Sequence, residues 1–198
     1  MTTSSQKPRL ILASTSPYRK AQLQQLQIPF DVMASNVDEE EFKRREHRPR
    51  GLALQLALAK AEQIAKDHPD AVVIGGDQLV SFDSEILGKP HTQEKAIEQL
   101  MQLSGQKHVL ITAVAVCHRG VRQTHLDETQ MWMRHFNHDT AERYVEIDQP
   151  LDCAGAYKIE SLGISLFERI ETKDHTAITG LPLLAISKLL NALGINVP

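Results

Sequence analysis

Hydrophobic residues along this chain form two kinds of pattern. Short and nearly continuous apolar runs are typical of strands that are buried on both faces. These runs are residues 10–13, 71–74, 109–116 and 164–167. Between them, apolar residues recur at the spacing of helices that are covered on one face. These helices are expected at residues 17–26, around 52–63, at 92–103 and at 181–193. Their order predicts an α/β fold with a mixed sheet.

Local signals mark where some of these helices begin and end. Ser16 is placed to cap the first helix, and Pro17 suits the first helical position. Gly194 follows the last expected helix, as glycine often does. The polar stretch at residues 36–50 shows neither pattern, and its simplest interpretation is a solvated loop, which could also close over a ligand.

Composition narrows the class of protein. With 41% hydrophobic and 24% charged residues, the 198-residue chain is neither disordered nor fibrous, and it is long enough for one domain or two small lobes. A net charge of -3 argues against nucleic acid as a partner, although the basic residues 43–50 could contact RNA. No stretch approaches the roughly 18 apolar residues that a membrane-spanning helix needs.

Two cysteines, Cys117 and Cys153, make neither a disulfide framework nor a metal-binding CxxC motif. A cytoplasmic protein is therefore expected. Residues 1–8 contain no apolar segment of the kind found in signal peptides, so we expect a short flexible tail followed by one domain at residues 9–198.

The strongest local motif is LILASTSPYR at residues 10–19. A buried strand leads through a Ser/Thr cluster directly into a helix, which gathers hydroxyls, backbone N–H groups and the positive end of the helix at one place. Arg19 could add a bidentate phosphate contact. The motif therefore indicates an anion-binding turn. The alternative is simple capping by Ser16, which gives Ser14 and Thr15 no role.

A second motif, VVIGGDQLV, places Asp77 after two glycines in a buried run. At the carboxyl end of a strand, where α/β proteins usually bind ligands, Asp77 could act as a base or as a metal ligand. The alternative is an Asx-turn after a Gly-Gly bend.

Two lysines and two further acids complete the candidate site. Lys60 interrupts an alanine-rich helix face, and Lys89 lies in the rigid sequence Gly-Lys-Pro. Either could be an ordinary surface lysine. Together with Arg19 they match the cations that polyphosphate cleavage requires, while Asp38 and Glu39 could hold Mg²⁺ with Asp77.

Seven motifs in this order resemble those of the Maf family of nucleoside triphosphate pyrophosphatases. They are LILASTSPYRKAQL, NVDEE, ALAKA, GGDQ, GKP, DCAGAY and TGLPL, and they extend from about residue 9 to about residue 193. The resemblance implies an elongated α/β fold with a mixed central sheet flanked by helices, and two lobes with a cleft between them, related to inosine triphosphate pyrophosphatases. It also implies a homodimer and dependence on a divalent cation, Mg²⁺ or Mn²⁺.

The resemblance also implies roles for individual residues. The general base falls on Asp77, which would bind the metal together with Glu39. The phosphate contacts fall on Ser14, Arg19, Lys60 and Lys89. The implied reaction is that of a phosphoanhydride hydrolase: water attacks the α-phosphorus of a nucleotide, and pyrophosphate and a nucleoside monophosphate are released.

Three positions in the family set the base, and here they are Tyr18, Gln78 and Glu160. The dTTP and UTP branch has arginine, threonine and glutamine at these positions, whereas this chain is similar to the branch that acts on 7-methyl-GTP. N7-methylation makes guanine cationic, so the face of Tyr18 would attract it, and Glu160 would accept from its N1–H and amino groups. The alternative is that Tyr18 covers the first helix and Glu160 is a surface acid.

The sequence leaves other functions open. They are a pyrophosphatase for dTTP, UTP or other nucleotides, a nucleotidyltransferase, and a non-catalytic nucleotide-binding regulator of cell division.

Overall fold

The computed structural model describes residues 8–197 of the chain. The strands are β1 (Leu10–Leu12), β2 (Asp31–Val32), β3 (Val72–Phe82), β4 (Glu85–Leu87), β5 (Lys107–His118), β6 (Val121–Met133) and β7 (Phe167–Glu171). The α-helices are α1 (Pro17–Gln24), α2 (Glu39–Arg45), α3 (Pro49–Asp67), α4 (Gln93–Leu103), α5 (His138–Asp148) and α6 (Leu183–Ala192). Three 3₁₀ helices are η1 (Ala154–Ala156), η2 (Leu162–Leu166) and η3 (His175–Thr179).

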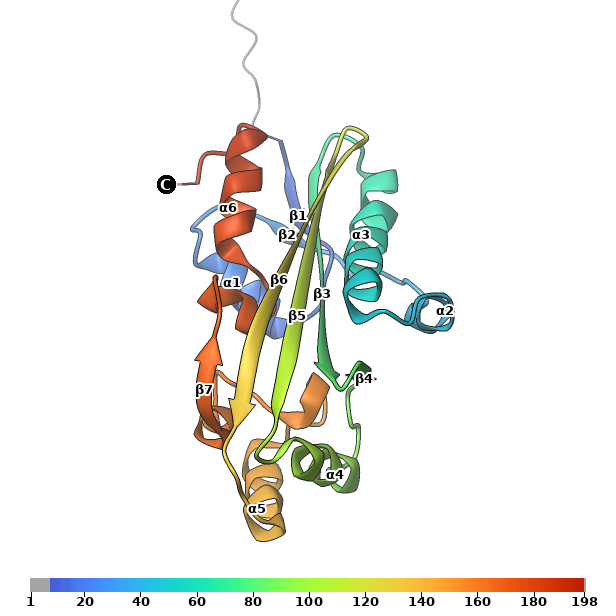
Figure 1. Cartoon of the computed structure of the whole chain (residues 1–198). Coiled ribbons are helices and arrows are strands. Elements are labelled where there is room, and N and C mark those ends of the chain that lie inside the picture. Colours follow the sequence, from blue (N-terminus) through green and yellow to red (C-terminus); the bar gives the residue numbers. More distant parts are fainter. Residues whose placement is uncertain (1–7, 198) are drawn as a thin grey trace, which may run out of the picture.

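The strands form one mixed sheet of seven strands. Its order is β2-β1-β3-β5-β6-β7, with β4 paired to β3. β1 runs parallel to β2 and β3, and the remaining pairs are antiparallel. The long strands β3, β5 and β6 give the molecule its elongated shape (Figure 1). The predicted α/β class, with a mixed central sheet flanked by helices, is confirmed.

Helix α3 covers one face of the sheet, where it packs very closely on β3. A Cβ on Gly75 would come within 2.3 Å of the Ala57 carbonyl oxygen, so only glycine permits this approach. The helix presents Leu52, Leu56 and Ala61 to the core, and it lies on the opposite side of the long strands from α6 (Figure 1). This close packing brings the polar residues of α3 next to β3.

The other face carries two apolar cores, one after the other along the strands. Val72 and Ile74 of β3 belong to the core under α1 and α6. Val80 belongs to the core built with α4 and α5. Gln78 of β3 and Thr112 of β5 lie between the two cores as a polar pair. The two predicted lobes thus have separate cores on this face.

Two predictions of local structure are wrong. Residues 164–167 do not form a strand, because η2 extends to Leu166 and β7 begins only at Phe167. Within this run Leu166 is buried but Ile164 is 51% exposed, so its apolar residues are not buried as those of a core strand would be.

The polar stretch 36–50 is likewise not a loop, since it contains α2 and the start of α3. Asp38 caps α2. Acidic residues occupy the first turn of this helix and basic residues its last turn, so the charges of this polar stretch complement the helix dipole.

Within residues 8–197, none of the helices combines the length and the hydrophobicity needed to cross a bilayer. The tail predicted at residues 1–8 lies, except for Pro8, outside the described residues.

Candidate active site

An unpaired stretch of β3 lies at the centre of the candidate site. On one edge, β1 pairs with Val72–Ile74 and β4 pairs with Val80–Phe82. Within the described chain, no strand pairs with residues 75–79 on that edge. Side chains from both faces of the sheet can therefore converge beside Asp77.

Asp77 lies within β3, not at its end and not in a turn. The strand continues for five residues beyond Asp77, because the residues that follow the glycines pair with β5 as far as Ser81. The predicted location of Asp77 at the carboxyl end of its strand is therefore wrong. The alternative of an Asx-turn is wrong.

Lys60 of α3 joins two carboxylates. Its Nζ lies 2.7 Å from Oδ1 of Asp77 and 2.7 Å from Oε1 of Glu39, the first residue of α2. Asp77 is 5% exposed and Lys60 is 8% exposed, so this is not a surface lysine. Oδ2 of Asp77 is buried and has no hydrogen-bond partner among the described residues. One oxygen of a buried carboxylate thus remains available to a ligand.

The charges in this group affect one another strongly. Burial raises the pKa of Asp77, against the opposing effect of the Lys60 and Arg19 cations. Burial also favours a higher pKa for Glu39, but the hydrogen bond and charge of Lys60 outweigh it, so the pKa of Glu39 is lowered. The pKa of Arg19 is lowered by burial, while Asp77 and Glu39 oppose this shift. Arg19, Lys60, Asp77 and Glu39 therefore form one electrostatic group.

The turn after β1 brings Ser14 and Arg19 together. Ser14 Oγ accepts from the Ser16 backbone N–H at 3.2 Å and from Arg19 Nη1 at 3.5 Å. Ser16 Oγ accepts from the Arg19 backbone N–H at 3.4 Å, as the capping alternative expects. The capping alternative is thus confirmed for Ser16, which caps α1, while the buried Ser14 contacts Arg19, and the binding of an anion at this turn stays a prediction. Thr15 is exposed.

The other predicted charged residues divide between the site and the surface. Lys89 is exposed in the segment after β4, and its charge contributes to the lowered pKa of Glu39, so it lies near the acid group. Asp38 accepts from the backbone N–H groups of Glu40 and Glu41, which makes it the cap of α2.

A second group of residues surrounds Tyr18 on α1. Burial raises the pKa of the half-buried Tyr18 to about 12, with contributions from Cys153, Asp152 and Glu160. Burial also raises the pKa of Cys153 to about 12, aided by both carboxylates, so its thiol is not a reactive nucleophile. Glu160 thus lies near enough to Tyr18 to affect its hydroxyl, and recognition of a base by these two residues stays a prediction. Asp152, which lies in the DCAGAY motif, was not among the predicted site residues.

Gln78 is hydrogen-bonded to the backbone of η3. Its Nε2 donates to Thr112 Oγ1 and to the carbonyl oxygens of Ala177 and Ile178, each at 3.0 Å. The structure therefore gives Gln78 a contact with η3 that the sequence does not reveal.

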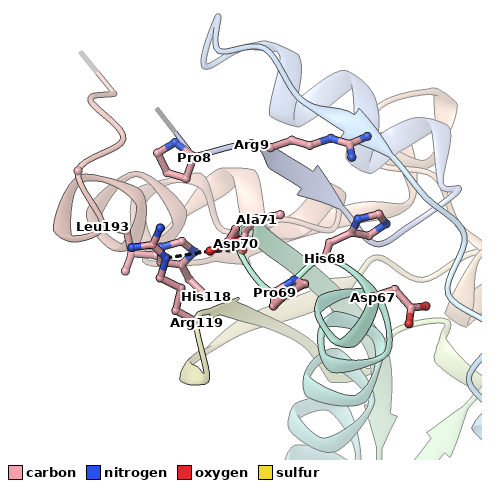
Figure 2. A pocket seen from close by; sticks show the side chains of 11 residues that line it. Pro8, Arg9, Asp67, His68, Pro69, Asp70, Ala71, His118, Arg119 and Leu193 are labelled. Atoms are coloured by element: carbon pink, nitrogen blue, oxygen red, sulfur yellow. Dashed lines mark hydrogen bonds and ion pairs between the residues drawn. The ribbon is translucent and has the colours of Figure 1, made fainter. Parts of the chain in front are cut away.

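A hollow of about 840 Å³ lies where β1 and β3 begin, at the end of these strands that is away from the candidate site (Figure 2). Some of the polar side chains that line it are already paired within the protein. His118 Nδ1 lies 3.1 Å from the Ala71 carbonyl oxygen, and Arg119 forms an ion pair with Asp70 at 3.3 Å. None of the predicted site residues is among the residues that line it. These are Pro8, Arg9, Asp67, His68, Pro69, Asp70, Ala71, His118, Arg119, Leu193 and Gly194.

Comparisons with known proteins agree with the motif series. A family model described as Maf-like protein matches residues 9–193. A protein of Bdellovibrio bacteriovorus named 7-methyl-GTP pyrophosphatase is 49% identical over 92% of this chain and 95% of its own length. Proteins with the same name from Xanthomonas axonopodis pv. citri and Polaromonas sp. are 46% and 45% identical, over 96% and 94% of this chain and 100% and 85% of their own lengths.

Solved structures show weaker similarity. A nucleoside-triphosphatase / dITP/XTP pyrophosphatase of Mycobacterium abscessus is 14% identical, with a TM-score of 0.48 over 94% of this chain and 97% of its own. The Ham1 protein of Staphylococcus aureus is 14% identical, with a TM-score of 0.44 over 63% and 71%. The family match over nearly the whole chain and the identity to three full-length relatives leave one conclusion: this chain belongs to the Maf family.

Proposed function

We propose that this chain hydrolyses the α–β phosphoanhydride of 7-methyl-GTP and releases 7-methyl-GMP and pyrophosphate. The proposal depends above all on one observation, the buried Asp77 carboxylate at the open edge of β3, which is paired with Lys60 and feels the charge of Arg19. The names of three relatives at 45–49% identity support the substrate.

Charge at the site suits a triphosphate. Arg19, Lys60 and Lys89 carry three positive charges against the two carboxylates of Asp77 and Glu39, which leaves a single positive charge. Lys60 pairs with both carboxylates and the three cations together outweigh their charge, so a polyanion can approach without strong repulsion. Arg19 and Lys89 would then bind phosphate oxygens, with Ser14 adding a hydroxyl contact.

Asp77 is the residue placed to move the proton. Its Oδ2 has no hydrogen-bond partner in the described chain, and burial raises its pKa toward the range in which a carboxylate accepts a proton from water. In the proposed reaction this oxygen has one of two roles: it takes the proton of the water that attacks the α-phosphorus, or it binds the divalent cation described next. The cations neutralise the negative charge that gathers on the pyrophosphate leaving group.

The same residues fit a divalent cation. Carboxylate oxygens are the ligands that Mg²⁺ and Mn²⁺ prefer, and Asp77 and Glu39 lie on either side of one ammonium nitrogen, with Asp77 Oδ2 unpaired. These two residues would hold the cation. When bound, it would supply positive charge that stabilises the phosphate oxygens in the transition state.

The group around Tyr18 suits a cationic base. The carboxylates of Asp152 and Glu160 lie close enough to Tyr18 to raise the pKa of its hydroxyl. N7-methylguanine would meet the aromatic face of Tyr18 in a field that favours positive charge. This arrangement supports 7-methyl-GTP over unmodified GTP and over dTTP or UTP. A cytoplasmic location and a homodimer remain predictions from the sequence.

The first experiment compares 7-methyl-GTP, GTP, dTTP and UTP as sole substrates with Mg²⁺ or Mn²⁺, scored by pyrophosphate release. We expect kcat/KM for 7-methyl-GTP to exceed that for dTTP and UTP by roughly tenfold or more. A nucleotidyltransferase would need an acceptor and would release no pyrophosphate under these conditions. A regulatory protein would bind nucleotide without turnover. Faster hydrolysis of dTTP would contradict the substrate assignment.

Substitutions at Tyr18 and Glu160 test how the base is recognised. Tyr18→Arg removes the aromatic face and adds a positive charge, and Glu160→Gln removes a negative charge. Each is expected to reduce the ratio of kcat/KM for 7-methyl-GTP to that for GTP, because only the methylated base carries the positive charge. A loss of about 0.5–2 kcal/mol of cation–π attraction corresponds to roughly two- to thirtyfold.

Glu168→Gln is the matched control, because Glu168 is an exposed glutamate on β7, at the far edge of the sheet from β3. In this control variant, the ratio of kcat/KM for 7-methyl-GTP to that for GTP should equal the wild-type ratio. Equal losses on both nucleotides in Tyr18→Arg and Glu160→Gln would exclude recognition of the methylated base by these residues.

A further inference from the structure

Glu160 lies at the corner of a tight turn. The Ser161 backbone N–H donates to the Lys158 carbonyl oxygen at 3.2 Å, which closes a turn of four residues with Glu160 in its third position. Gly163 packs against the first residue of this turn, since a Cβ on it would come within 2.4 Å of the Lys158 carbonyl oxygen. Glu160 itself is exposed, so its place depends on what holds the two ends of the turn.

Both ends of this turn are bonded to α5. The Lys158 backbone N–H donates to the hydroxyl oxygen of Tyr144 at 2.9 Å, and Tyr144 is 3% exposed. Ser161 Oγ donates at 2.5 Å to Oδ1 of Asp148, the last residue of α5. The helix thus holds the first and the last residue of the turn.

The ammonium group of Lys158 adds a third attachment. Its Nζ donates to the carbonyl oxygens of Asp148 and Gln149 at 2.9 and 3.0 Å, and the side chain is only 17% exposed. Lysine often bonds the last carbonyls of a helix, where the helix dipole also favours a cation. The same nitrogen lies 3.9 Å from Asp152 Oδ1. Lys158 therefore connects α5 both to the turn of Glu160 and to Asp152.

This attachment bears on the recognition of a cationic base. Asp152 and Glu160 both act on the hydroxyl of Tyr18, whose ring would receive the N7-methylated base. A carboxylate attracts a cation best when it is held in place, because ordering a mobile side chain costs free energy on binding. The charge of Lys158 by itself would instead repel such a base. Two carbonyl oxygens and the Asp152 carboxylate offset that charge.

We propose that Lys158 and Tyr144 are positioning residues that hold the turn at residues 158–161 against α5 and thereby orient Glu160 for the N7-methylated base. They act on the reaction through Glu160. The inference rests on the role of Glu160 within the proposed function.

Lys158→Met tests the inference by the sign of its effect. Methionine keeps much of the aliphatic stem but bonds neither carbonyl, so Glu160 should lose its fixed place. The ratio of kcat/KM for 7-methyl-GTP to that for GTP should fall by roughly threefold or more. Affinity for inorganic tripolyphosphate with Mg²⁺, measured by calorimetry, should stay within about twofold of the wild type. If Lys158 acted only through its charge, its removal would favour the cationic base and raise the ratio. A raised or unchanged ratio overturns the inference.

Two further lysine variants control for charge and for substitution as such. Lys158→Arg retains donors for the carbonyl oxygens and should keep the ratio within about twofold of the wild type. Lys95→Met makes the same chemical change at an exposed lysine on α4 and should leave the ratio unchanged. A loss in Lys158→Arg as large as that in Lys158→Met would contradict a role for these hydrogen bonds.

Tyr144→Phe removes the acceptor of the Lys158 backbone N–H without any change in charge. The ratio should again fall, and amide hydrogen exchange at residues 158–163 should be faster than in the wild type, as it should be in Lys158→Met. Should Tyr144→Phe not fold, Ser161→Ala removes the bond to Asp148 at an exposed residue, with the same expected results. Unchanged exchange and an unchanged ratio in the folded variants would overturn the inference.

A double-mutant cycle links Lys158 to Glu160. In the Glu160→Gln background, Lys158→Met should cause no further fall in the ratio. Additive losses would mean that Lys158 acts independently of Glu160, which overturns the inference. Failure of the proposed function would appear as a wild-type protein that does not hydrolyse 7-methyl-GTP, and the inference would fail with it. Failure of the inference alone would appear as a ratio that falls in Glu160→Gln but not in Lys158→Met.

Discussion

Replacing Asp77 by asparagine is expected to lower the rate of pyrophosphate release by about a thousandfold while the protein remains folded. Asparagine has the same shape and keeps an oxygen that Lys60 can bond. It cannot become a negatively charged base, and it is a weak ligand for Mg²⁺. General base catalysis alone contributes about 10²- to 10⁴-fold, so the loss should lie in that range. Steady-state rates with 7-methyl-GTP at saturating Mg²⁺ measure it.

Asp83→Asn is the control for this prediction. Asp83 is an exposed aspartate in the turn that follows β3, and its φ of +48° is one that asparagine adopts readily. The same chemical change there should leave the rate at the wild-type value. A near-normal rate for Asp77→Asn, with Asp83→Asn also normal, would contradict the role of Asp77.

The sequence pointed to Asp77 as a candidate residue, but it did not predict where the strand that contains Asp77 ends. Asp77 was expected at the end of a buried run, but β3 continues to Phe82 because β5 pairs with it almost throughout. The ligand-accessible edge exists because β1 ends at Leu12 and β4 begins to pair only at Val80. Where one strand ends relative to its neighbour is a tertiary feature, which periodicity within a single strand does not report.

The contacts that sequence reasoning missed join residues far apart in the chain. Lys60 and Asp77 were both candidates, but their direct contact follows from the close approach of α3 at Gly75. Asp152 reaches the Tyr18 group only through the fold. Gln78 was assigned to the base from its place in a motif, whereas its bonds to η3 depend on which face of β3 it occupies. Motifs therefore predicted several residues that the fold brings together, but they did not predict which groups each residue contacts.

Replacing Lys60 by methionine is expected to reduce the free energy of unfolding by about 3–5 kcal/mol, the usual cost of removing one partner from a buried ion pair. Methionine has a similar length but no charge, so the buried Asp77 carboxylate would lose its hydrogen bond and its counter-charge. Urea denaturation at neutral pH measures the change. Lys66→Met is the control, because Lys66 is an exposed lysine on the same helix, and the expected change there is below about 0.5 kcal/mol.

Two further measurements separate loss of charge pairing from loss of packing. The double variant Lys60→Met/Asp77→Leu removes both charges, so it should recover most of the lost stability while it remains inactive. The destabilisation of Lys60→Met should also shrink as the pH falls. Burial raises the pKa of Asp77 in the folded state, so folding favours its protonated form, and a neutral carboxyl no longer needs the ammonium. If the loss were instead constant with pH and persisted in the double variant, the ion pair between Lys60 and Asp77 would not be its cause.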